Sequence, residues 1–183
     1  MAKKTLLLLA LVLMNNVMLF AQSKNLPLVK KSFRRRHVTY LPCPNDWVSY
    51  KGSPSCYKVP RRLTNSWFDA RKSCIAMGSD LVKISSDQEN DFVALLAHSY
   101  FPVTTHLIYQ AAWIGLISDT KRIFSWVDAT KLAGQFTNWH KGEPNNAVKN
   151  EDCAVIYIDS RKTWNDVPCK WVKIPYICEK ERA

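Results

Sequence analysis

Six cysteines in a chain of 183 residues constrain this sequence more than any other feature, because the N-terminus indicates export. Lys3 and Lys4 supply a positive start, Thr5–Met14 is an uninterrupted apolar run, and small Ala21 precedes polar residues. This pattern is typical of a secretory signal peptide, so we predict a signal peptide over residues 1–21 with cleavage after Ala21. Exported cysteines meet an oxidising compartment, where thiols pair, and an even number leaves none over.

An uncleaved signal anchor is the alternative interpretation of residues 1–21. Residues 5–21 are short for a bilayer core of about 30 Å and contain two amides, which disfavours an anchor. The rest of the chain has no charge-free apolar stretch of that length, so we predict a secreted protein without a membrane span. No cysteine pair has C-x-x-C spacing, so zinc and thioredoxin-type sites lack support.

The formal net charge of +11 first suggests a nucleic-acid-binding protein, but the positions of the charges argue against it. Loss of residues 1–21 removes Lys3 and Lys4 and no acid, which leaves +9, and six more basic residues fall in the acid-free segment 22–42. We therefore predict no nucleic-acid partner. The basic segment 22–42 has three open interpretations: a solvated tail, a propeptide cut near residues 34–36, or a patch for anionic surfaces.

Residues 43–180 show the pattern of one folded α+β domain. We expect a hairpin over 40–57, a helix over 65–77, and a second helix that begins at Ser86 through a Ser-x-x-Glu capping box. Residues 128–152 lack a regular pattern, and a loop of that length is usually functional. Short runs rich in β-forming residues predict strands over 111–116, 123–127, 154–158 and 176–179.

The long loop and the segment after it are rich in oxygen ligands. Glu143, Asn145 and Glu151 lie in the loop, and Asn165 and Asp166 follow it. Carboxylate and amide oxygens without His or Cys are ligands that suit Ca²⁺. Three carboxylates around one Ca²⁺ leave a negative site that repels itself when empty, so we expect the metal to hold the loop.

The domain contains six short motifs: Trp113-Ile114-Gly115-Leu116, Asn138-Trp139, Glu143-Pro144-Asn145, Glu151-Asp152-Cys153, Trp164-Asn165-Asp166 and Tyr176-Ile177-Cys178. Together with the six cysteines, these motifs resemble the C-type lectin-like domain family and, within it, secreted lectins of the mannose-binding type. The resemblance implies the family's long form, with two helices flanking antiparallel strands, a long calcium-binding loop, and no catalysis. The disulfides that it implies are Cys43–Cys56, Cys74–Cys178 and Cys153–Cys169.

The resemblance also implies one Ca²⁺ site whose ligands bind the sugar. In the family, a cis bond precedes the residue at Pro144, and two vicinal sugar hydroxyls complete the coordination of the ion. Each hydroxyl donates to a carboxylate and accepts from an amide. The order acid-then-amide at Glu143 and Asn145 goes with mannose, fucose or N-acetylglucosamine, and the reverse order with galactose. The implied metal and sugar ligands are Glu143, Asn145, Glu151, Asn165 and Asp166.

A second calcium site has only partial support from the residues. Asp119 and Asp152 match acids that hold a second ion in many relatives, whereas Asn146 replaces an acid and Lys121 stands where another is expected. The implied partners are glycans on microbial or host cell surfaces. One shallow sugar contact is weak, so useful avidity favours clustering of domains, for example in a homo-oligomer.

Two other functions compete with a lectin. A glycosidase could use paired carboxylates as acid and base, but these carboxylates are needed ionised as metal ligands and no nucleophile set accompanies them, so we predict no enzyme. A lectin-like domain that binds a protein or an anionic surface without sugar is the second alternative. Among the remaining side chains, we expect Trp113, Trp126 and Trp139 in the core, Trp164 as buried support, and Asp87, Glu89, Asp91 and Asp128 as caps and solvated faces.

Overall fold

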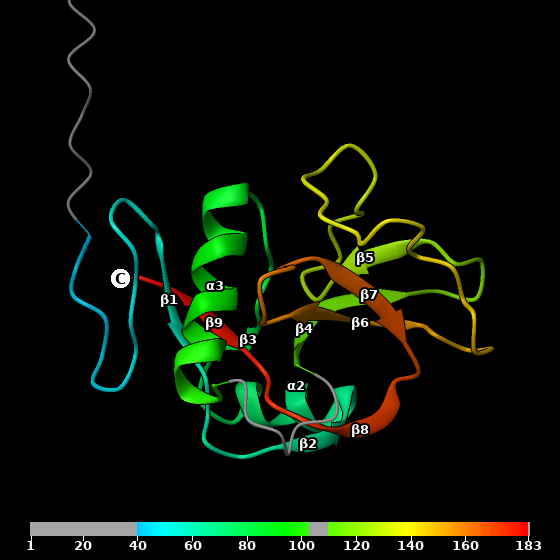
Figure 1. Cartoon of the computed structure of the whole chain (residues 1–183). Coiled ribbons are helices and arrows are strands. Elements are labelled where there is room, and N and C mark those ends of the chain that lie inside the picture. The colour runs from blue at the N-terminus through cyan, green and yellow to red at the C-terminus, as the bar shows by residue number, and fades with distance from the viewer. Residues whose placement is uncertain (1–39, 103–109, 183) are drawn as a thin grey trace, which may run out of the picture. The chain divides into compact units, whose positions relative to one another are not determined.

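The computed structural model describes residues 40–102 and 110–182. The predicted signal peptide and nearly all of the basic segment 22–42 lie outside these residues. Figure 1 shows the described elements, and their order along the chain is β1 (Ser55–Lys58), β2 (Thr64–Ser66), α2 (Trp67–Ile75), β3 (Asp80–Leu81), α3 (Asp87–Tyr100), β4 (Ala111–Ser118), β5 (Phe124–Trp126), β6 (Cys153–Tyr157), β7 (Trp164–Val167), β8 (Lys170–Ile174) and β9 (Cys178–Glu181).

Within the described residues, the strands form three sheets, and the strands that pair within each sheet are antiparallel. The strand orders are β1-β9-β3, β2-β8 and β5-β4-β6-β7. Helix α3 lies beside the first sheet, and α2 lies next to β2 and β8 below the four-stranded sheet (Figure 1). This arrangement confirms the predicted α+β class. In the described ranges, none of the helices has the length and apolar character to cross a membrane.

The hairpin expected over 40–57 is reduced to one bridge between Val48 and Tyr57. The main partner of β1 is instead β9, near the other end of the chain. The domain contains three disulfides: Cys43–Cys56, Cys74–Cys178 and Cys153–Cys169. They are the pairs that the family resemblance implies, and no described cysteine is free.

The two described helices, α2 and α3, each begin at a serine cap. The Ser66 side chain accepts from Asp69 N–H, and the Ser86 side chain accepts from Glu89 N–H at 3.2 Å. The expectation that Glu89 is a solvated cap is wrong, because the residue is only 3% exposed. Its carboxylate accepts from Ser85 N–H at 2.8 Å and from the Tyr57 hydroxyl at 2.5 Å, so it joins α3 to β1.

Tryptophans connect the helices to the four-stranded sheet. Trp113, Trp126 and Trp164 are at most 2% exposed, and Trp139 is only partly buried against the same core. The Trp67 indole of α2 donates to Ile114 O on β4 at 2.7 Å. Trp67 thus joins α2 to β4, and Trp164 joins β7 to Asn90 of α3.

Gly115 of β4 lies against the backbone of Leu81 and Val82. A Cβ placed on Gly115 would lie 2.8 Å from the carbonyl oxygens of both Leu81 and Val82, so only glycine fits there. This contact explains the glycine of the Trp-Ile-Gly-Leu motif.

Glu179 lies on the central strand β9 of the three-stranded sheet. One of its carboxylate oxygens accepts from Lys83 N–H at 2.9 Å. Burial raises the pKa of Glu179 to about 7 from an ordinary value of 4.5, and the charge of Glu89 adds to the rise. The fold therefore favours the protonated form of this side chain.

We predict that Glu179→Gln stabilises the domain at alkaline pH. An acid whose folded-state pKa is raised destabilises the fold progressively as the pH rises from its unfolded value of 4.5 through about 7. Urea unfolding should therefore show the variant more stable than the wild type by about 3 kcal/mol near pH ~8, with little difference near pH ~4.

Glu181→Gln provides the matched control, since it alters an exposed carboxylate on the same strand. It should leave the pH dependence of unfolding unchanged. If Glu179→Gln followed the wild-type profile as well, burial of Glu179 would carry no cost.

Candidate functional site

The predicted loop rises above the four-stranded sheet, between β5 and β6 (Figure 1). Its Glu143–Pro144 peptide bond is cis, as the resemblance implies. Where the loop rejoins the sheet, β6 pairs with β7 so that Ala154 faces Asp166 and Val155 faces Asn165. The pairing of β6 with β7 therefore places the second group of predicted ligands beside the end of the loop.

Four of the five predicted ligands are in direct hydrogen-bond contact. The Asn145 amide donates to Glu143 Oε1 at 2.9 Å, and Asn145 N–H donates to Asp166 Oδ1 at 3.0 Å. The terminal amide atom of Asn165 that faces Glu143 lies 2.9 Å from Oε1 and 3.1 Å from Oε2, and both groups are satisfied when that atom belongs to the NH2 group. Glu143 thus accepts from an amide on either side.

Glu151 joins this group through the loop backbone. Its N–H donates to the Asn146 side-chain oxygen at 3.0 Å, and Asn146 N–H donates to Asp166 Oδ2 at 3.0 Å. Glu151 and Asp166 are only 6% and 1% exposed. Glu151 Oε2 is buried without a hydrogen-bond partner in the described part of the chain.

The carboxylates of the site repel one another. Burial and, after it, the neighbouring Asp166 together raise the pKa of Glu143 to about 7. Burial also raises the pKa of Glu151, again with a contribution from the charge of Asp166. Both shifts show that the arrangement as it stands disfavours negative charge.

Calcium fits this set of donors. Ca²⁺ takes carboxylate and amide oxygens, and a cation here would relieve the repulsion and give Glu151 Oε2 a partner. Counting only His, Cys, Asp and Glu, no three side chains of the described residues are arranged as a metal site. The fit therefore depends on the two amides, Asn145 and Asn165. A turn of the Asn165 amide by about 180° brings its oxygen to the point where its NH2 now faces Glu143.

The acids of the doubtful second site have other partners. Asp152 accepts from the Ser118 hydroxyl at 2.9 Å and from Arg122 at 3.2 Å. Asp119 accepts from the N–H groups of Lys121 and Ile123, each at 2.9 Å. The sequence analysis missed Arg122. The sequence signal that could have found it is an arginine that closely follows Asp119, one of the acids matched to a second calcium site.

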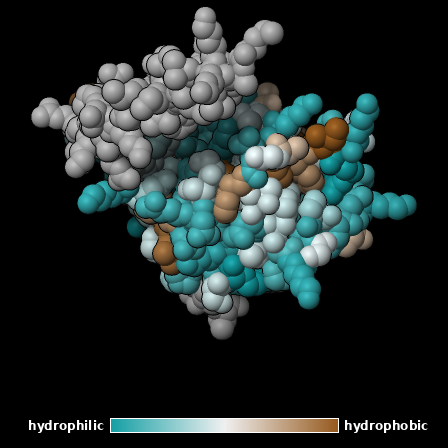
Figure 2. Space-filling view, turned by 90° about the horizontal axis from the view of Figure 1, so that it is seen from above, coloured by the Kyte–Doolittle hydropathy of each residue, from teal (hydrophilic) through white to brown (hydrophobic). Residues whose placement is uncertain are grey.

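Two aromatic side chains near the site contact other parts of the domain. Trp164 is fully buried and its indole donates to Asn90 of α3 at 2.7 Å, which confirms its role as support. His140 Nδ1 lies 3.1 Å from the hydroxyl of Thr163, the residue before β7, so the two side chains share a hydrogen bond. In the part of the view from above that Figure 2 shows in colour, most residues are hydrophilic and a band of apolar residues lies among them.

Comparisons with known proteins match this architecture. The family model for the lectin C-type domain matches residues 63–180. The chain is 34% identical over 142 residues to C-type lectin domain family 4 member E of Mus musculus, a match that covers 75% of this chain and 59% of that relative.

Two solved structures are also similar. The C-type lectin domain of murine dendritic cell inhibitory receptor 2, in complex with N-glycan, has a TM-score of 0.62 and 31% identity and covers 76% of this chain and 99% of its own. The cow carbohydrate-recognition domain of CD23, determined in the presence of GlcNAc2Man3 oligosaccharide, has a TM-score of 0.62 and 28% identity and covers 78% of this chain and 98% of its own. This protein therefore belongs to the C-type lectin domain family, whose members are non-enzymatic carbohydrate-binding proteins.

Proposed function

We propose that this protein is a secreted, calcium-dependent lectin that binds mannose-type sugars. The observation that carries the proposal is the grouping of Glu143 with the amides of Asn145 and Asn165. Calcium, when bound, supplies the positive charge that lets these oxygens share one point. Each amide would then turn its oxygen to the ion and keep its NH2 group free to donate to a sugar hydroxyl.

The order of these side chains supports the choice of sugar. Each of two neighbouring hydroxyls needs one acceptor and one donor, and the carboxylates of Glu143 and Glu151 supply acceptors while the two amides supply donors. Glu143 comes directly before Pro144, to which it is joined by the cis bond, and Asn145 comes directly after it. In the family this order goes with the equatorial 3- and 4-hydroxyls of mannose, fucose and N-acetylglucosamine.

Two further observations support the proposal: one concerns the sugar, and the other concerns a location outside the cell. The cow CD23 domain, similar in fold and 28% identical, was solved in the presence of an oligosaccharide that contains mannose and N-acetylglucosamine. The three disulfides of the domain fit an oxidising compartment, as does the signal-peptide pattern of residues 1–21. Glycans on microbial or host cell surfaces are the partners that we propose, bound with useful avidity through a homo-oligomer.

We predict that the protein binds mannose-agarose in about 5 mM Ca²⁺ and is released by EGTA, since extracellular calcium modules bind with Kd of about 10⁻⁴ to 10⁻³ M. Glu151→Gln, which removes a buried ligand charge, should abolish retention, whereas Glu181→Gln should behave as the wild type. Retention that persists in EGTA would contradict calcium bridging. Absence of retention on mannose, fucose and N-acetylglucosamine columns would favour a domain that binds a protein or an anionic surface.

We predict that the double variant Glu143→Gln with Asn145→Asp prefers galactose. The exchange keeps the number of carboxylates at the site, so calcium binding should persist, and only the positions of donor and acceptor are reversed. Competition elution with free mannose and free galactose measures the preference, which should shift by about tenfold because each misplaced hydrogen bond costs about 1 kcal/mol. An unchanged sugar profile, with calcium still bound by calorimetry, would show that other residues set the specificity.

A further inference from the structure

The Arg122 side chain contacts oxygens from two parts of the candidate site, the end of the long loop and strand β7. Nη2 donates to Asp166 Oδ2 at 2.5 Å. Nη1 donates to Glu151 O and, at 3.2 Å, to Asp152 Oδ1. The guanidinium also packs over the Phe124 ring, 5.2 Å from its centre. One cation therefore links β7 to the end of the long loop.

A turn in the backbone sets Arg122 in this position. Arg122 N–H donates to Asp119 O at 2.9 Å, and the Asp119 carboxylate accepts from the N–H groups of Lys121 and Ile123. Because Asp119 is used within the turn, it is not the partner of the guanidinium. The turn orients Arg122 toward Asp152 and Asp166.

Asp166 needs a positive partner. Its carboxylate is 1% exposed and accepts from the N–H groups of Asn145 and Asn146, which are neutral donors. A buried carboxylate is costly unless a charge or several hydrogen bonds compensate it, and a charge-assisted contact is the stronger kind. Arg122 makes the one side-chain ion pair that Asp166 has among the described residues.

We propose that Arg122 is a built-in cation, which holds residues 128–152 in their binding conformation before any metal arrives and occupies the place of a second calcium ion. The three oxygens around the guanidinium, from Glu151, Asp152 and Asp166, are of the kind that would coordinate a hard metal. Arg122 is a positioning residue: it acts on the sugar site through Asp166 and Glu151. Its effect on calcium affinity rests on the proposed function, whereas its effect on the metal-free loop does not.

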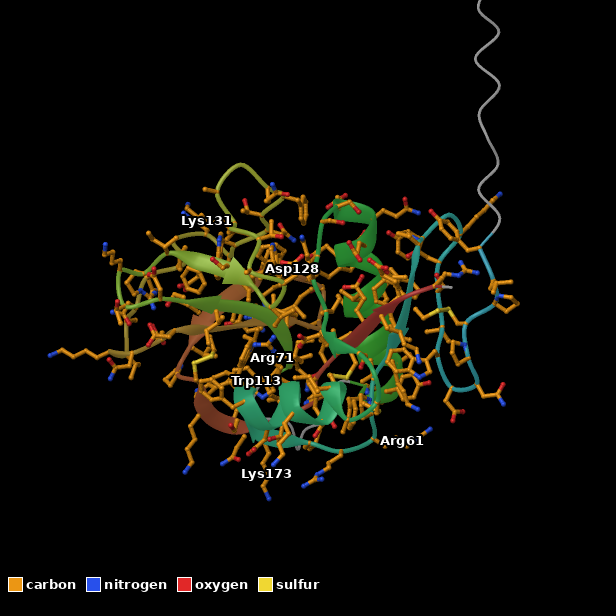
Figure 3. All side chains as sticks on the ribbon, turned by 180° about the vertical axis from the view of Figure 1, so that it is seen from behind. Arg61, Arg71, Trp113, Asp128, Lys131 and Lys173 are labelled. Atoms are coloured by element: carbon orange, nitrogen blue, oxygen red, sulfur yellow. A yellow bond between two sulfur atoms is a disulfide. The ribbon has the colours of Figure 1, made fainter. Side chains whose placement is uncertain are left out.

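Arg71 offers a matched control. Its guanidinium pairs with Asp80 at 2.9 Å and donates to the backbone oxygen of Val127 at 3.1 Å, which repeats the carboxylate-plus-carbonyl contacts of Arg122. Arg71 is a residue of α2, and its side chain lies on the side of the helix that faces the sheet (Figure 3). Arg71→Met therefore removes an arginine of the same kind without touching the candidate site.

The test is limited trypsin digestion in EGTA, with mass spectrometry of cleavage after Lys141 and Lys149, two exposed residues of the loop. Loss of charged hydrogen bonds should make cleavage about tenfold faster in Arg122→Met than in the wild type, with Arg71→Met within about twofold of it. Arg122→Lys keeps the charge but cannot span the three oxygens, so it should restore only part of the protection. Equal cleavage of Arg122→Met and the wild type, or full protection in Arg122→Lys, would overturn the bridging role.

Calorimetric titration with Ca²⁺ separates this proposal from the proposed function. We expect Arg122→Met to bind calcium about tenfold more weakly, within the range for loss of an outer-shell contact. Tighter binding by Arg122→Met would overturn the proposal, because it would mean that the guanidinium only competes with calcium for Asp166. If the wild type itself bound no calcium, the proposed function would fail, and the digestion in EGTA would still decide the role of Arg122.

Discussion

The buried carboxylate of Asp166 is the contact on which the candidate site depends. Asp166 lies on β7, and its carboxylate accepts hydrogen bonds from two loop N–H groups and one guanidinium. The cysteines that flank it in the chain close a disulfide from Cys153 to Cys169, so β7 cannot drift from the end of the loop. A long irregular segment thereby acquires a fixed conformation without regular hydrogen bonding of its own.

The sequence predicts the parts of this arrangement that depend on local chemistry. Ser66 and Ser86 begin helices because a serine oxygen satisfies a free N–H of the first turn, and this signal is readable in a few residues. The ligand set around Glu143 was likewise readable, because a family resemblance accompanies it. The shared partner that joins these ligands, Asp166 with its three donors, is the detail that the resemblance alone does not supply.

The predictions that failed or were absent involve partners far apart in the chain. Glu89 looks like a solvated cap, since a Ser-x-x-Glu pattern is local, but its burial comes from Tyr57, which lies 32 residues away. Strand β8 was not predicted because its burial is irregular, and it exists by pairing with β2. Arg122 was missed for the same reason: a single arginine acquires its role only when β6 and β7 bring three oxygens to it.

The raised pKa of Glu143 invites comparison with a general acid, since a carboxyl group that titrates near neutrality is a common feature of catalytic sites. The neighbours of Glu143 argue for a different purpose. A general acid needs a proton and a reacting bond beside it, whereas Glu143 accepts from an amide on either side and lies next to another carboxylate. The pKa rises first because Glu143 is buried and then because Asp166 lies beside it, and a bound cation would oppose both effects. The raised pKa therefore fits the proposed calcium site, and the proposal agrees with membership of a family of carbohydrate-binding proteins that are not enzymes.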